Sequence, residues 1–341
     1  MSVEQDAIII SFRQHGKELF STGVPVVLTV SGGADSLALM HLGVASGLVI
    51  PSRDVVAHFD HGLREESRGE AEFVINQAQG LGLECFVERW TDHALIAKGN
   101  LSERAREARY AFFLRIAQKC HAGLIATGHH KDDQAETFLD HLLRGSGTRG
   151  LSGMAARRPL TSEVSLIRPL LFFRRYELEN WLTTAGVAWV EDPTNQNPKY
   201  LRNRIRHDLL AAFTRTAGYD SVHSITTTAL QMARADTALD WMLERIWPEL
   251  NPTLDTNHLS LTLSWSKLAA LPDELICRSL VYCHKKLTKA PFPPGFRARE
   301  GFLYLVRTKR RQWSMCVRNL EIYRDHDTIF ITAAISSKNG S

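Results

Sequence analysis

The stretch VVLTVSGGADSLAL, residues 26–39, predicts how the first half of the chain folds. Its apolar start, residues 26–30, predicts a buried strand, and the apolar spacing that follows predicts a helix over about 36–46. Between them lie Gly32 and Gly33, which let a backbone approach a ligand closely. The start of a helix offers unpaired N–H groups and a partial positive charge. The stretch therefore predicts a pyrophosphate site, with a simple capped turn as the alternative.

Polar side chains of the same loop fit this interpretation. Ser31 and Ser36 are able to donate hydroxyl hydrogen bonds, and Asp35 is able to bind Mg²⁺ or a water held by it. A Walker A sequence is absent. GSGTRG at 145–150 fits the dinucleotide-binding fingerprint, but it follows a predicted helix instead of a strand. We interpret it as a glycine-rich loop.

Short apolar runs and helical spacing alternate through the first half of the chain. Strands are predicted at 55–59, 84–88 and 124–127, and helices at about 69–80, 101–121 and 132–143. This alternation predicts a parallel twisted sheet with helices on both faces, a Rossmann-like α/β fold. Ligands of such sheets bind at the carboxyl ends of the strands.

The second part of the chain has a different pattern. Helices are predicted at about 221–248 and 272–289, followed by β-like runs at 303–306, 312–317 and 328–332. We therefore expect two domains, residues 1–215 and a smaller α+β domain at 216–341.

Basic residues gather late in the chain, although the net charge of the 341 residues is only +4. Clusters of this kind favour a nucleic-acid partner, and a solvated surface is the alternative. The cluster members that we single out are Lys199, Arg202, Arg204, Arg206, Arg307, Arg310 and Arg311.

The spacing of the cysteines and the lack of long apolar runs argue against several classes of protein. The five cysteines include no C-x-x-C pair, which argues against a disulfide framework, a zinc ribbon and a dithiol redox site. The N-terminus does not have the pattern of a signal peptide, and no run of 18 apolar residues is present. We expect a cytoplasmic protein with no membrane partner.

S-G-G-x-D-S after a strand resembles the loop of the pyrophosphatase-loop (PP-loop) ATPases, which have an adenine-nucleotide α-hydrolase-like fold. Further motifs follow in order: HFDHGLR (58–64), RAREARY (104–110), ATGHHKDDQAET (126–137), RPLL (168–171) and EDPTNQNPKYLRNRIRH (191–207). Together they resemble the tRNA(Ile)-lysidine synthetase family over about residues 25–210. The resemblance weakens beyond 215, and we expect the chain to stop before the further C-terminal domain that some members carry.

The resemblance implies a reaction. ATP activates C2 of the wobble cytidine in tRNA(Ile) with a CAU anticodon, and the ε-amine of free L-lysine displaces AMP to give lysidine. ATP and Mg²⁺ are the implied cosubstrate and metal, and a homodimer is left open. His58 and Asp60 end the second strand, where the adenine and ribose would lie.

A lysine pocket needs carboxylates at one end and a cation at the other. Asp132, Asp133 and Glu136 open the helix after the fourth strand, where Glu136 shares a face with both aspartates. We expect Asp35 and these three carboxylates to be catalytic, although acidic residues also suit a helix start without any function. Arg106 and Arg109 lie one turn apart on the preceding predicted helix, and we expect them to bind the carboxylate of lysine or a phosphate, with a solvated helix face as the alternative. Asp132 and Glu136 are then expected to bind the lysine at its other end.

Two neighbouring histidines follow the fourth predicted strand. His129 and His130 are expected to line the substrate pocket instead of binding zinc, because adjacent histidines diverge and no further ligand is close in sequence.

A PP-loop tRNA thiolase is the nearest rival function, but such enzymes need paired cysteines. A non-catalytic RNA-binding protein is the rival from another class, and the intact acidic residues argue against it.

Overall fold

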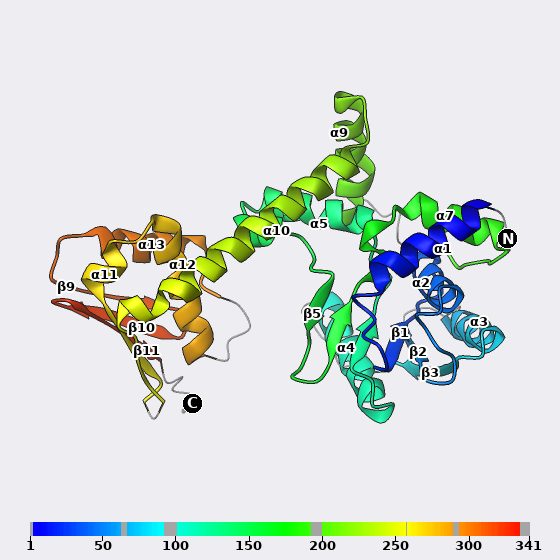
Figure 1. Ribbon diagram of the computed structural model, residues 1–341, viewed down its shortest axis with the longest axis horizontal. Helices are drawn as coiled ribbons and strands as arrows, with labels where there is room; N and C mark the ends of the chain where they lie inside the picture. Colours follow the sequence, from blue (N-terminus) through cyan, green and yellow to red (C-terminus); the bar gives the residue numbers. More distant parts are fainter. Residues whose placement is uncertain are drawn as a thin grey trace. The chain divides into compact units, whose positions relative to one another are not determined.

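The computed structural model describes residues 3–62, 67–91, 101–191, 200–256, 258–288 and 293–334. The chain divides into two compact units, Met1–Ala233 and Arg234–Ser341. Each unit has its own sheet (Figure 1).

The first unit contains a six-stranded sheet in the order β3-β2-β1-β4-β6-β5. Neighbouring strands are parallel, except that β5 runs antiparallel to β6. The strands are β1 (Val26–Thr29), β2 (Val55–Asp60), β3 (Glu84–Arg89), β4 (Leu124–Ala126), β5 (Arg157–Pro159) and β6 (Ser165–Ile167). The sheet confirms the predicted fold class.

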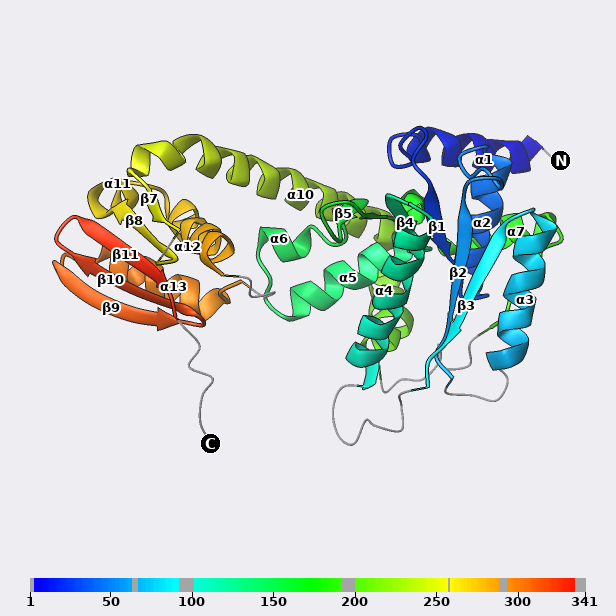
Figure 2. The same cartoon turned by 90° about the horizontal axis from the view of Figure 1, so that it is seen from below.

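Helices cover both faces of this sheet, with α3 on one side of β2 and β3 and α4 on the other (Figure 2). The helices before and around the sheet are α1 (Val3–Gly16), α2 (Ala34–Ala45), α3 (Ser67–Gly80), α4 (Leu101–Lys119), α5 (Lys131–Leu143), α6 (Thr148–Leu151), the 3-10 helix η2 (Pro169–Phe172) and α7 (Arg175–Thr184). The sequence did not predict α1, whose Phe12 is fully buried.

The alternation of side chains along β1 explains its continuous apolar sequence. Leu28 packs in the core that contains α2 and α7, whereas its neighbour Val27 packs in the core that contains Phe112 of α4. Because both faces are buried, Val26, Val27 and Leu28 are all apolar, and the polar Thr29 at the end of the strand donates its hydroxyl to the Ala126 carbonyl (3.0 Å).

After α7 the first unit continues through α8 (Leu201–Arg204), the π-helix η4 (Ile205–Leu209) and α9 (Leu210–Ala217) into α10 (Ser221–Ile246), of which it includes the residues up to Ala233. Val222 and Ala229 of α10 share a buried cluster with Phe138 and Leu139 of α5. This packing accounts for the position at which the two compact units divide, inside α10 after Ala233. The domain boundary expected between residues 215 and 216 stays a prediction.

The second unit is built on a five-stranded antiparallel sheet in the order β7-β8-β11-β10-β9. Its elements are η5 (Trp247–Leu250), β7 (Thr253–Asp255), β8 (Ser260–Ser264), α11 (Trp265–Ala269), α12 (Asp273–Leu287), α13 (Phe296–Arg307), β9 (Gln312–Val317), β10 (Leu320–Asp325) and β11 (Thr328–Ala333). One sheet face packs against the helices in a single core.

One prediction in this unit is wrong: residues 303–306 lie in α13 and do not form a strand. Phe302 and Val306, one turn apart, are fully buried, while Tyr304 between them is exposed. This spacing buries one face of a helix. The runs predicted at 312–317 and 328–332 do form strands, β9 and β11.

Candidate active site

The loop after β1 is shaped by its own serines. The Ser31 amide donates to Ser36 Oγ (3.1 Å), and the Ser36 hydroxyl donates to the Gly33 carbonyl (2.9 Å). Gly32 has a φ of +93°, a conformation that favours glycine. Its carbonyl accepts a hydrogen bond from the Val190 amide (2.9 Å). The loop is therefore held in one shape at the start of α2, as a phosphate-binding loop requires.

The loop after β4 approaches this helix start closely. A Cβ added to Gly128 would lie 3.0 Å from the carbonyl carbon and oxygen of Asp35 and 3.1 Å from the Ser36 amide nitrogen. Only glycine fits there without a shift of the backbone. The sequence analysis did not single out Gly128, although it directly follows a predicted strand of the same sheet.

His130, the residue before α5, joins the two loops. Its side chain is 1% exposed, and its Nε2 lies 3.5 Å from an oxygen of Asp35 and 3.5 Å from an oxygen of Asp133. Its Nδ1 lies 3.6 Å from Asp132. Burial alone lowers the pKa of His130, but hydrogen bonds to Asp132 and Asp35 and the charges of Asp133 and Asp35 raise it to about 10. We infer that His130 is a cation at neutral pH.

The charge of His130 also decides how α5 begins. A protonated imidazole donates from both nitrogens, so its Nδ1 cannot accept from the Asp133 amide, which lies 3.4 Å away. The helix start is instead held by Asp133, whose Oδ2 accepts from the His130 amide (3.0 Å).

The ring of His129, unlike that of His130, is neutral at neutral pH. Burial lowers its pKa to about 4, partly opposed by Asp133 and reinforced by Arg168, Arg202 and His130. Its Nδ1 lies 2.8 Å from the Thr127 hydroxyl. The two adjacent histidines thus differ in charge, because the His130 ring lies 3.5–3.6 Å from oxygens of Asp35, Asp132 and Asp133, whereas the His129 ring forms no ion pair with a described residue.

Asp132 is held by α7. Its carboxylate accepts from the Arg174 guanidinium (Nη2 to Oδ1, 2.9 Å) and from the Arg175 amide (2.8 Å). Burial alone raises the pKa of Asp132, but hydrogen bonds from His130, Arg174 and Arg175 lower it well below its ordinary value. Arg174 also pairs with Asp220. These contacts place Asp132 in the framework of the site, a role that the sequence did not reveal.

Asp133 and Glu136 form a buried acidic pair, 6% and 1% exposed. Arg202 donates from Nε to Glu136 (2.7 Å) and from Nη2 to Asp133. Arg206 donates to both oxygens of Glu136, at 2.5 and 3.2 Å. Two arginines that the sequence analysis assigned to tRNA therefore lie on two predicted catalytic carboxylates.

The remaining predicted residues of the first unit lie apart from this pair. His58 is buried, and its Nδ1 donates to the Val30 carbonyl (2.8 Å), next to the phosphate-binding loop. Asp60 is buried and accepts from the Gly62 amide (2.7 Å). Arg106 and Arg109 both lie against Tyr110, with their guanidinium carbons 5.5 and 6.0 Å from its ring centre.

The other predicted tRNA-binding residues differ in their contacts. Arg204 is exposed, as are Arg310 and Arg311 of the second unit. Arg307 pairs with Asp273 and donates to the Leu271 carbonyl (2.7 Å), which ties α13 to α12. Lys199 lies outside the described residues.

Comparison with known proteins gives the family. A family model described as a PP-loop domain matches residues 8–213. A curated tRNA(Ile)-lysidine synthase from Novosphingobium aromaticivorans is 39% identical over 257 residues, 75% of this chain and 74% of that protein. The chain belongs to the tRNA(Ile)-lysidine synthase family. Curated relatives of the same name from Ruegeria pomeroyi and Anaplasma marginale are 38% and 37% identical over 82% and 74% of this chain, and 65% and 53% of their own lengths.

A solved structure shares the fold. The U34-tRNA thiolase NcsA from Methanococcus maripaludis, with its [4Fe-4S] cluster, matches with a TM-score of 0.55 at 16% identity, over 67% of this chain and 80% of that one. In our chain all five cysteines are free. Burial raises the pKa of Cys85 and of Cys277 to about 11, so both are thiols at neutral pH.

The donor set suits Mg²⁺ held jointly with a substrate. Across the part of the chain that the structure describes, no group of three or more His, Cys, Asp and Glu side chains could hold a metal ion. Proteins commonly bind Mg²⁺ through one or two carboxylates and substrate phosphates. Asp35 fits such a site, because it lies in the first turn of α2 and its Oδ1 is buried without a hydrogen-bond partner among the described residues.

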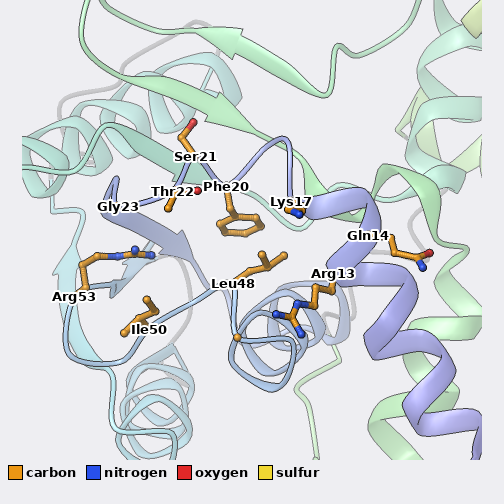
Figure 3. A pocket seen from close by; sticks show the side chains of 11 residues that line it. Arg13, Gln14, Lys17, Phe20, Ser21, Thr22, Gly23, Leu48, Ile50 and Arg53 are labelled. Carbon is orange, nitrogen blue, oxygen red and sulfur yellow. The ribbon is translucent and has the colours of Figure 1, made fainter.

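A cavity of about 540 Å³ lies elsewhere, at the amino ends of the strands (Figure 3). Arg13 of α1, Lys17 directly after that helix, Phe20 and Gly23 before β1, and Arg53 before β2 line it. The phosphate-binding loop and the acidic pair contribute none of its lining, so the candidate site remains at the carboxyl ends.

No described helix is long and apolar enough to cross a membrane.

Proposed function

We propose that the chain uses ATP to attach free L-lysine to C2 of the wobble cytidine of tRNA(Ile) with a CAU anticodon. The cytidine O2 attacks the α-phosphorus of ATP, the bond to the β-phosphate breaks, and pyrophosphate leaves. The neutral ε-amine of lysine then attacks C2, the C2–O2 bond breaks, and AMP leaves with that oxygen. The family assignment and the geometry of the site support this reaction.

The loop after β1 serves the first step. Amides at the start of α2 and the hydroxyls of Ser31 and Ser36 face the pyrophosphate in this proposal, and the backbone of Gly32 and Gly33 allows its approach. Mg²⁺, held by Asp35 and the phosphates, would neutralise charge on the leaving group. His58 and Asp60 are proposed to lie beside the adenine and ribose.

The acidic pair serves the second step. Only a neutral amine is nucleophilic, so the ε-ammonium must lose a proton before attack. Asp133 and Glu136 are buried carboxylates that already bind cationic groups, which makes them the proposed site for the ammonium and for its proton. Asp132 remains a weaker proposal for either role, because Arg174 and the Arg175 amide occupy its oxygens.

One observation carries the proposal: His130 contacts Asp35 of the phosphate-binding helix and Asp133 of the acidic pair, each at 3.5 Å. The place where pyrophosphate would leave and the place where the amine would be deprotonated are therefore neighbours. A ligase that activates one substrate and transfers it to an amine needs this proximity.

The tRNA partner is proposed to contact the basic residues of both units: Lys199, Arg202, Arg204, Arg206, Arg307, Arg310 and Arg311. Arg106 and Arg109 are proposed to bind the lysine. We also propose that residues 216–341 form the tRNA-binding domain and that the protein acts in the cytoplasm.

The deciding experiment incubates the protein with ATP, radiolabelled L-lysine and a tRNA(Ile) transcript that bears CAU. We expect label in the tRNA, together with AMP and pyrophosphate. A transcript with a CAU→GAU anticodon is the matched control, because it lacks the cytidine. Absence of label transfer to the CAU transcript would overturn the proposal, and transfer of labelled sulfide in its place would assign the chain to the thiolases.

A further inference from the structure

Arg168 lies at the same edge of the sheet as the candidate site. It directly follows β6, and the β6 residue before it, Ile167, accepts a hydrogen bond from the Thr127 amide at the end of β4 (3.1 Å). The two histidines of the site come directly after that strand. His129 is close enough to Arg168 and to Asp133 for both to shift its pKa. Arg168 thus lies near the acidic pair, with His129 close to both.

The Arg168 side chain is buried and incompletely bonded. It is only 6% exposed. Its Nη1 donates to the Ala155 carbonyl, whereas its Nε has no hydrogen-bond partner among the described residues. A buried cationic donor without a partner is costly, and such groups call for an explanation. A guanidinium that presents a free N–H suits an oxyanion ligand, since it binds carboxylates and phosphates through charge-assisted hydrogen bonds.

The surroundings of Arg168 are cationic. Burial lowers the pKa of Arg168, Tyr110 raises it, and the nearby guanidinium groups of Arg158 and Arg106 lower it further. Arg109 also lies against Tyr110, with its guanidinium carbon 6.0 Å from the ring centre. Within the described ranges, none of these four arginines forms an ion pair with a carboxylate. Like charges gathered without a counter-charge favour the binding of an anion.

We propose that Arg168 binds the carboxylate of the free amino-acid substrate. This inference rests on the proposed function and adds the residue that selects which amines react. The side-chain ammonium of the amino acid then lies at Asp133 and Glu136, and its carboxylate lies at Arg168, beside Arg106 and Arg109. A diamine without a carboxylate gains nothing from Arg168, so the residue favours an amino acid over a free polyamine.

The test compares L-lysine with cadaverine, the same diamine without the carboxylate, in transfer to the CAU transcript. For Arg168→Met we expect the KM for lysine to rise about 10- to 100-fold, because a charge-assisted hydrogen bond is lost. The KM for cadaverine should stay within about twofold of the wild-type value. Arg168→Lys, which keeps the charge, should give an intermediate KM for lysine and serves if the Met variant does not fold.

Two controls isolate the effect. The tRNA-dependent exchange of pyrophosphate into ATP precedes lysine attack and should be unchanged in Arg168→Met. Arg157→Met alters an exposed arginine of β5 that contacts the Ser21 hydroxyl (3.3 Å), and its kinetics should match the wild type.

Three results would overturn the inference: an unchanged KM for lysine, an equal rise for lysine and cadaverine, or a rise in the KM for tRNA alone. The last would assign the oxyanion to a phosphodiester of the tRNA. A wild-type protein that transfers neither amine contradicts the proposed function itself, a different outcome from an active wild type with an unaffected Arg168 variant.

Discussion

The Arg202 guanidinium donates to the Glu136 carboxylate over 2.7 Å, although the two residues are 66 positions apart in the chain. Glu136 is 1% exposed, whereas the Arg202 side chain is 53% exposed. A half-exposed arginine therefore neutralises a fully buried acid. When Arg202 leaves that position for a phosphate of the tRNA, Arg206 remains on Glu136, and the ammonium of lysine can take the place of Arg202.

Replacement of Arg202 by Met should lower both stability and tRNA affinity. Loss of the ion pair leaves Glu136 with Arg206 alone, and we expect the free energy of unfolding to fall by about 1–3 kcal/mol, less than for a fully buried pair. If Arg202 contacts a phosphate, the slope of log affinity against log salt concentration should fall by about one unit. Chemical denaturation and filter binding at several salt concentrations measure these quantities.

Arg204→Met is the matched comparison, because Arg204 is exposed and has no ion pair with a described residue. Its free energy of unfolding should stay within about 0.5 kcal/mol of the wild type, while its salt dependence should flatten to the same extent. Wild-type tRNA affinity of both variants at every salt concentration would contradict the assignment.

Glu136→Gln and Asp133→Asn should separate the two chemical steps. Each removes a proposed acceptor for the ammonium proton, so we expect lysine transfer to fall by about 100-fold or more. The tRNA-dependent ATP–pyrophosphate exchange should remain, because it does not involve the amine. Asp140→Asn is the control, since Asp140 lies on the same helix and pairs with the exposed Arg144. Full lysine transfer by both variants would exclude the acidic pair from catalysis.

The local part of the site could be predicted from the sequence, and the pairing of its charges could not. Ser31, Gly33 and Ser36 lie within six residues, and their loop follows from the order strand, glycines, helix. The contact of Arg174 with Asp132 joins residues 42 positions apart and depends on how α7 packs, for which the sequence gives no spacing signal. The error at residues 303–306 has a related cause, because four apolar positions fit a strand or one side of a helix equally well.

His129 predicts an acid-sensitive stability. Its pKa is lowered from an ordinary value of 6.5 to about 4, chiefly by burial, so the folded state favours the neutral ring. The resulting stability is present above pH 6.5 and is lost as the pH falls from 6.5 toward 4, where the unfolded state takes up the proton first. Urea denaturation at pH 7, 6, 5 and 4 should show this decline, and in His129→Gln it should be shallower. Identical pH profiles of the two proteins would contradict it.

Gly128→Ala tests the close approach of the two loops. The added Cβ would lie 3.0 Å from the carbonyl carbon and oxygen of Asp35. Because neither the Cβ nor the carbonyl group can rotate away independently of the backbone, the start of α2 must move. We expect the free energy of unfolding to fall by about 1–3 kcal/mol. The rate of ATP–pyrophosphate exchange should fall by tenfold or more, because the displaced amides no longer face the pyrophosphate. Gly147→Ala is the control, since Gly147 has a φ of −78° and open space around its Cβ position. Equal exchange rates in the two variants would show that the contact between Gly128 and Asp35 does not shape the phosphate-binding loop.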